Sequence, residues 1–248
     1  MEFSFTEEQK MIRDTAEAFL AEISSSHSIR KAMATEQGFE HEIWQRICSE
    51  MYWQAIHIPE EYGGLGLGYV DLVVMLEQMG RYLLCSPFFS TVCLGANALM
   101  VAGTAEQKQS YLSQICEGGL TSTLAYTCSN GQWGANAVQT TVVAQGDDYV
   151  LNGIYLYVPD GHTAQLLIVA ARNEGSAGEE GISLFAIPAD TTGVKRTWLP
   201  TMDETRKQAE VVLDNVILSK DHLMGELGKA WQQLNKIIQL ATIATAAE

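Results

Sequence analysis

The amino-acid sequence predicts an α+β fold, with an N-terminal all-α helix bundle, then an antiparallel β-barrel or sandwich domain, then the start of a C-terminal helical domain. Apolar residues recur at three- and four-residue steps through the first 120 residues, which is typical of amphipathic helices. Beyond Gly118-Gly119 the apolar runs become short and β-branched, which favours strands. Helical spacing returns from Gly228. We therefore expect domains at residues 1–119, 120–226 and 227–248.

Several helices account for the first predicted domain. The first begins at about Thr6, where the run Thr6-Glu7-Glu8-Gln9 resembles a capping box, and extends to about Ile23. A second helix is expected over residues 40–51, before Pro59 and the glycine cluster at 63–68 force a loop. Helical spacing then continues over residues 69–82, 90–102 and 105–116.

The second predicted domain consists of strands separated by turns. Strand-like runs cover residues 121–127, 138–144, 149–151, 166–171, 182–187 and 209–213. Turn residues separate them at 146–148, at Asn152-Gly153 and at 175–181. Strands at this spacing favour an antiparallel sheet over βαβ units. The final helical segment, from Gly228, carries no stop signal, so we expect a chain that ends in mid-helix.

Composition excludes several classes of function. The 248 residues are 47% hydrophobic and 18% charged, which indicates a globular protein. A formal net charge of −15 argues against nucleic-acid binding. The five cysteines include no CxxC pair and the five histidines have no ligand spacing, so no metal is expected. Because the sequence shows no leader and no apolar run of about 20 residues, we expect a cytoplasmic protein without membrane contact.

Three ordered motifs resemble a known family. The run Ile58-Pro59-Glu60-Glu61-Tyr62-Gly63-Gly64-Leu65-Gly66 is similar to the P-E-x-x-G-G-x-G segment that joins early helices in acyl-CoA dehydrogenases. The run from Gly146 to Gly153 resembles the family's G-D-x-Y/W-x-L-N-G hairpin. The runs 213–216 and 223–226 resemble its last middle-domain strand and the loop into its C-terminal helices. The resemblance therefore covers the whole chain in order.

The resemblance implies oxidation of a fatty, branched or steroid side-chain acyl-CoA to the 2,3-enoyl thioester with FAD. In the family a Glu removes the α-proton while the β-hydrogen leaves as hydride to the flavin. That Glu lies in the C-terminal domain, or at a position that falls here on about Ala241. We therefore assign no catalytic residue, and we expect Glu248 to be a solvated chain end.

The resemblance also implies the ligand-facing residues, several of them altered. Thr127 keeps its family identity, but Trp133 stands where a small Ser meets FAD and acyl-CoA, and Pro159 offers no N–H. The family's acyl-CoA anchors in the last helix fall on Gln239 and Thr242. The expected substrate contacts are thus Trp133, Gln239 and Thr242, and the expected FAD contacts are Leu124, Ala125, Tyr126, Thr127, Trp133, Tyr157, Val158 and Pro159.

These alterations leave three hypotheses open. The first is an FAD-dependent acyl-CoA dehydrogenase whose catalytic base lies outside this sequence, with an electron-transferring flavoprotein as the usual acceptor. The second is a non-catalytic, flavin-depleted partner in a dehydrogenase built from two unlike subunits. The third is an acyl-CoA-binding module. Each is compatible with a homo- or hetero-oligomer.

Overall fold

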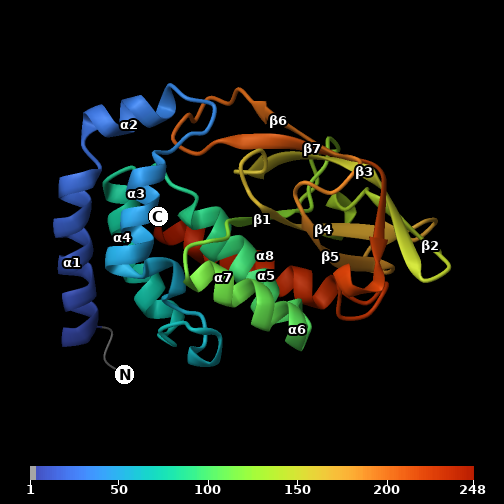
Figure 1. Ribbon diagram of the computed structural model, residues 1–248, viewed down its shortest axis with the longest axis horizontal. Helices are drawn as coiled ribbons and strands as arrows, with labels where there is room; N and C mark the ends of the chain where they lie inside the picture. Colours follow the sequence, from blue (N-terminus) through green and yellow to red (C-terminus); the bar gives the residue numbers. More distant parts are fainter. Residues whose placement is uncertain (1–3) are drawn as a thin grey trace.

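A computed structural model describes residues 4–248, so the first three residues of the predicted N-terminal domain lie outside the described residues. Figure 1 shows two neighbouring regions, with helices at one end of the molecule and a sheet at the other. The last helix, α8 (Trp231–Ala247), returns from the sheet to lie beside the early helices. The predicted fold class is confirmed.

The N-terminal helices follow the prediction, with one addition. α1 (Glu7–Ile23) begins at the expected capping box, in which the Gln9 N–H donates to Thr6 Oγ1 over 3.2 Å. α3 (His41–Arg46) continues into a π-helical turn, η1 (Ile47–Met51). The sequence did not predict α2 (Ser26–Met33), because this helix is short and mostly polar, and Ala32 is its one buried residue. Short 3₁₀ turns then follow, η2 (Trp53–Ala55) and η3 (Glu60–Tyr62).

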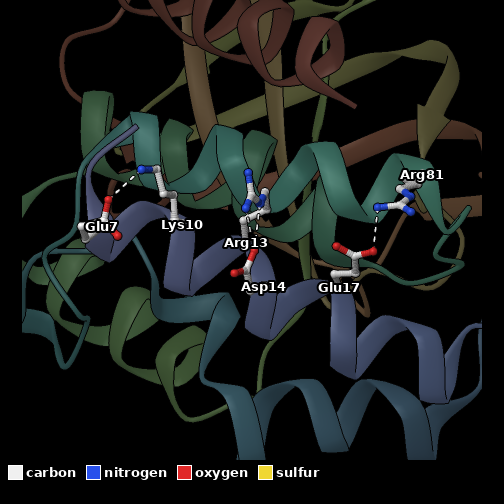
Figure 2. A network of polar contacts seen from close by, with 6 residues as sticks. All are labelled: Glu7, Lys10, Arg13, Asp14, Glu17 and Arg81. Carbon is white, nitrogen blue, oxygen red and sulfur yellow. Dashed lines mark hydrogen bonds and ion pairs between the residues drawn. The ribbon is translucent and has the colours of Figure 1, made fainter. Parts of the chain in front are cut away.

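α1 packs along α4 (Tyr69–Arg81), and charged side chains line the outer margin of this contact. Figure 2 shows Glu17 of α1 pointing toward Arg81 of α4, with an N–O distance of 2.8 Å. The Arg13–Asp14 and Glu7–Lys10 pairs lie along the same helix. Because these pairs are exposed and screened by solvent, they contribute little to stability, and the buried apolar side chains dominate the contact.

A fully buried π-helical segment, η4 (Phe89–Ala96), connects the helices to the sheet. It continues into α5 (Asn97–Ala102) and is followed by α6 (Ala105–Gln107), η5 (Lys108–Leu112) and α7 (Ser113–Cys116). At Gly95 a Cβ would lie 2.6 Å from the Ser122 Cβ, so this close approach of helix to strand requires glycine.

The second region is one eight-stranded sheet in the order β6-β7-β3-β2-β4-β5-β8, with β1 paired to β4. Most pairs are antiparallel as predicted, but β1 and β2 both run parallel to β4. The sequence did not predict β6, a half-exposed edge strand with little apolar alternation. The strands are β1 (Ser122–Ala125), β2 (Thr141–Gln145), β3 (Asp148–Pro159), β4 (Leu166–Asn173), β5 (Ile182–Pro188), β6 (Val194–Leu199), β7 (Gln208–Ser219) and β8 (Leu223–Met224), with the 3₁₀ turns η6 (Ala135–Ala137) and η7 (Lys220–His222) between them.

The predicted turn at Asn152-Gly153 is wrong. The β2–β3 hairpin turns at Gly146, which has φ +63°, and Asn152-Gly153 lies inside β3 at a shift in its register with β7. A Cβ on Gly153 would lie 2.6 Å from the Thr140 Cα. Glycine is therefore required here for close backbone approach at a bulge, and not for reversal of the chain.

Two hydrophobic cores meet at β4. Ile168 belongs to the core shared with the helices, whereas Val169 belongs to the core enclosed by the sheet. Because both faces of β4 are covered, its sequence is a continuous apolar run and not an alternating one. β1 is placed in the same way, with Leu124 on the helix side and Ala125 on the sheet side.

Candidate functional site

The end of β1 carries the predicted flavin strand. Leu124 and Ala125 are buried, and the chain becomes partly exposed at Tyr126 and Thr127. Burial raises the pKa of the Tyr126 phenol, so this hydroxyl stays protonated at neutral pH. The buried pair therefore anchors the strand, and the two following residues are accessible to a ligand.

Hydrogen bonds join this strand end to the end of β3. The Thr127 hydroxyl donates to the Leu156 carbonyl over 2.8 Å, and the Leu156 N–H donates to the Thr127 carbonyl over 3.1 Å. The Thr123 hydroxyl donates to the Pro159 carbonyl over 2.6 Å. The structure thus brings together the two segments, 124–127 and 157–159, that the sequence assigned to one ligand.

The β3 segment is distorted at this point. Its register with β7 shifts between Tyr155 and Val158, and Tyr157 adopts φ +59°. A tyrosine in this left-handed conformation costs of order 1 kcal/mol or more. As a result, the Tyr157 side chain is 59% exposed whereas Val158 is 1% exposed. The bulge directs one aromatic ring outward at the predicted ligand edge.

Trp133 lies in the segment that follows β1, residues 128–134, which we call the Trp133 loop. Its side chain is 78% exposed. Within the loop the Asn130 carboxamide donates to the Asn136 carbonyl over 2.7 Å, and its Oδ1 accepts from the Gln132 N–H over 3.0 Å. The loop therefore has an ordered base and presents an indole to solvent.

The two predicted substrate contacts on α8 are also exposed. Gln239 lies on the outer side of the helix, and the Thr242 hydroxyl donates to the Ile238 carbonyl of its own helix over 2.8 Å. Figure 1 shows α8 beside the helices, whereas the Trp133 loop follows β1 of the sheet. Among residues 4–248, no recorded hydrogen bond or ion pair joins Gln239 or Thr242 to the Trp133 loop, so a shared ligand would have to link them.

Sequence reasoning missed a buried carboxylate that directly follows Pro159. Asp160 has φ +50°, and its Oδ2 accepts from the Ser90 hydroxyl of η4 over 2.6 Å. Burial raises the pKa of Asp160 to about 6, against the opposing effects of the Ser90 hydrogen bond and the charge of Arg206. Arg206 in turn pairs with Glu248 and stacks over Phe89 at 4.2 Å. Glu248 is exposed as a residue, as expected for the chain end, but its side chain is ion-paired.

Sequence reasoning also missed Arg172, at the end of β4. Its side chain is 7% exposed and donates only to backbone carbonyls, including those of Ala135 and Val138 on the return path of the Trp133 loop. The signal was present in the sequence, because an arginine directly after the apolar run 166–171 cannot remain in a strand core without acceptors.

A planar ligand would find donors at one edge of this site. Within the described part of the chain, the N–H groups of Thr127 and Cys128 donate no hydrogen bond, so both are available to ligand acceptors. On the β3 side, Pro159 has no N–H. The β1 edge therefore offers two N–H donors, whereas the β3 edge has none at Pro159.

Three further features concern metal ligands, membrane-spanning helices and thiols. In residues 4–248 no group of three or more His, Cys, Asp or Glu side chains is arranged to hold a metal ion. Over the same residues, no helix has both the length and the apolar character needed to cross a bilayer. All five cysteines carry free thiols, and four of them are buried.

Comparison with known proteins identifies both regions. The model of the N-terminal domain of acyl-CoA dehydrogenases matches residues 6–119, and the model of their middle domain matches residues 123–216. A probable acyl-CoA dehydrogenase of Bacillus subtilis, YngJ, is 28% identical over all of this chain and 66% of its own length. The acryloyl-CoA reductase (NADH) of Anaerotignum propionicum is 28% identical, over 100% of this chain and 64% of its own length.

Solved structures show the same fold. The chain aligns over its whole length, with a TM-score of 0.86 and 23% identity, to 64% of a chain in the ChsE4-ChsE5 complex from Mycobacterium tuberculosis. The chain thus spans slightly less than two thirds of the relatives and the structure named here.

Proposed function

The chain belongs to the acyl-CoA dehydrogenase family, and from that premise we propose that it forms the floor of an FAD-dependent site for 2,3-dehydrogenation of an acyl-CoA thioester. The observation that carries this proposal is the hydrogen-bonded junction of β1 and β3. There the segments 124–127 and 157–159 meet, with unused N–H groups along one side.

In this proposal the chain's own residues hold the reactants and exclude water. Leu124 and Ala125 fix the strand from its two buried sides, and the N–H groups of Thr127 and Cys128 hold an acceptor edge of the flavin. Tyr157 and Pro159 line the neighbouring edge. When bound, FAD supplies the two-electron acceptor for the β-hydrogen, a chemistry that the protein's side chains lack.

The thioester would bind between the Trp133 loop and α8, where Trp133, Gln239 and Thr242 face solvent. A carboxylate base must also reach the α-carbon. We assign that base to no residue of this chain, and we propose that it comes from a further part of the protein or from a partner subunit. The domain division 1–119, 120–226 and 227–248 and a cytoplasmic location belong to the same proposal.

The test is the visible absorption spectrum of the purified chain, alone and after reconstitution with FAD and gel filtration. We expect a flavin spectrum at about one FAD per chain, and a perturbation of that spectrum when an acyl-CoA is added. Thr127→Val, which removes the hydroxyl joining β1 to β3, should weaken FAD binding, whereas Thr192→Val on an exposed loop should not. A colourless chain at saturating FAD would contradict the proposal.

A second function is favoured by two specific observations: the bulky, exposed Trp133 and the missing N–H at Pro159. Both features reduce the fit to a flavin. The alternative is therefore a chain that folds without FAD and acts as the partner subunit of a flavin-retaining paralogue. One solved structure with the same fold is a chain of the ChsE4-ChsE5 complex, so this fold occurs in a complex of two differently named proteins. In that case the double variant Trp133→Ser, Pro159→Thr should gain FAD binding, and the unmodified chain should co-purify with the paralogue.

The expected partner proteins differ between the proposed functions. A homo- or hetero-oligomer and an electron-transferring flavoprotein are expected for a dehydrogenase, whereas an acyl-CoA-binding module needs neither. Calorimetric titration with CoA thioesters in the absence of FAD separates these cases. Heat of binding without flavin supports the module, and its absence together with flavin binding supports the enzyme.

A further inference from the structure

Arg172 combines deep burial with the absence of any carboxylate among its recorded partners. The side chain is 7% exposed, at the end of the apolar strand β4. In the described residues it takes part in no ion pair. A buried guanidinium without hydrogen bonds would be strongly unfavourable, so its acceptors account for its presence.

Those acceptors are four backbone carbonyls from two separate loops. Nε donates to Val138 over 2.6 Å and Nη2 donates to Ala135 over 2.8 Å, both on the return limb of the Trp133 loop, residues 135–138. Nη1 donates to Ser176 over 3.0 Å and Nη2 to Gly178 over 3.0 Å, both in the β4–β5 connection. A single planar group therefore joins the two loops.

The Trp133 loop needs such a support because its tip makes few contacts. A Cβ on Gly131 or on Gly134 would meet nothing within 4 Å, so the chain on both sides of Trp133 is surrounded by open space. By contrast Ala135, Ala137 and Val138 are buried. The buried return limb thus determines where the exposed indole is held. Asn130 and Gln139 both donate to the Asn136 carbonyl of this limb, and Arg172 is the side chain that ties the limb to a second loop.

The contact pattern requires the guanidinium shape. Its N–H groups lie in one plane and point in several fixed directions, which matches carbonyls on two sides of the group. A lysine ammonium has three donors at a single point and cannot reach both loops at once. Because all four acceptors are main-chain atoms, substitutions within the loops would leave the interaction intact.

We propose that Arg172 is a positioning residue: it clamps the return limb 135–138 to the β4–β5 connection and so sets the place of Trp133 at the ligand side of the sheet. The positioning stands on the hydrogen bonds alone. Its consequence for FAD or acyl-CoA binding rests on the proposed function.

The test compares Arg172→Lys with Arg196→Lys as a matched control. Arg196 is also partly buried in the sheet and donates to backbone carbonyls, those of Gly161 and Ala164, at a different place. Chymotrypsin cleaves after tryptophan, so the rate of cleavage after Trp133, divided by the rate at all other sites, reports on this loop specifically. A general loss of stability raises cleavage at the other, buried sites at least as much as at the exposed Trp133, so it does not raise this ratio.

We expect Arg172→Lys to raise this ratio by about fivefold or more, as for a segment that opens locally, and Arg196→Lys to leave it unchanged. Equal ratios in the two variants would overturn the proposal. If Arg172→Lys does not fold, hydrogen exchange in the unmodified chain decides the matter. Amides 136–138 must then exchange far more slowly than amides 131–134, and equal rates would overturn it.

Titration with FAD and with CoA separates this proposal from the proposed function. If Arg172→Lys loosens the loop and also weakens FAD or CoA binding about tenfold, both stand. If it loosens the loop while the unmodified chain binds neither compound, the positioning stands and the proposed function fails.

Discussion

Replacement of Asp160 by asparagine should stabilise this protein at neutral and alkaline pH. The carboxylate is buried between the start of η4 and the segment before β7, where it accepts from the Ser90 hydroxyl and lies near Arg206. Neither interaction compensates fully for burial, because the pKa of Asp160 is raised from 3.8 to about 6. An asparagine keeps an oxygen for Ser90 and carries no charge to bury.

The size of the effect follows from the pKa shift. Because the folded-state pKa exceeds the unfolded value, the folded chain binds the proton more tightly. The contribution of Asp160 to stability is complete below pH 3.8 and is lost as the pH rises through about 6. A shift of about two units corresponds to about 3 kcal/mol. For a chain of this length that is a rise in Tm of roughly 6–12 °C.

The assay is urea unfolding of both proteins at pH 4.5 and at pH 8, followed by far-ultraviolet circular dichroism. Asp160→Asn should exceed the unmodified chain in unfolding free energy by about 3 kcal/mol at pH 8, but by only about 1 kcal/mol at pH 4.5. Asp147→Asn, at the exposed hairpin tip, is the matched control and should show no such difference. A variant that is less stable at pH 8, or a gap independent of pH, would refute the reasoning.

Two further predictions test the bulge in β3 and the helical region. Gly153→Ala should lower the unfolding free energy by about 2 kcal/mol or more, because its Cβ would lie 2.6 Å from the Thr140 Cα, whereas Gly134→Ala has open space; equal Tm values for the two would contradict this. Burial lowers the pKa of His57 below 6.5, although its hydrogen bond to Asn97 acts in the opposite direction. The contribution of His57 to stability is therefore lost as the pH drops below 6.5. The unfolding free energy at pH 5.5 minus that at pH 7.5, from urea unfolding, should thus be more positive in His57→Gln than in the unmodified chain; an equal difference would exclude His57 as a cause.

Local signals accounted for most of the elements. The capping box at Thr6 and the three- and four-residue spacing located α1 correctly, because both depend on residues within one or two turns. The same reasoning failed for α2 and β6, which are short, mostly exposed and held by neighbours distant in sequence. It also failed at Gly153, because an Asn-Gly pair looks the same in the sequence whether the glycine is needed for a turn or for close packing.

The candidate site was predicted in parts. Family resemblance located the segments 124–127 and 157–159, and the structure joins them through the Thr127 and Leu156 hydrogen bonds. It did not indicate that Tyr157 is turned outward by a bulge, because the left-handed conformation depends on the register of β3 with β7. Asp160 and Arg172 were missed because several of their partners, Ser90 for Asp160 and Ala135 and Val138 for Arg172, lie 34 to 70 residues away in the sequence.

By itself the sequence determined the order of most helices and strands, the family and the candidate ligand segments. Spacing, capping and motifs depend on residues that are close together in the sequence, so they can be read without the fold. Only the tertiary structure decided which strands pair, where β1 and β2 run parallel to β4, and which polar groups are buried. Burial and pairing depend on contacts between distant segments. The pKa of Asp160 and the carbonyl partners of Arg172 therefore exist only once the chain has folded.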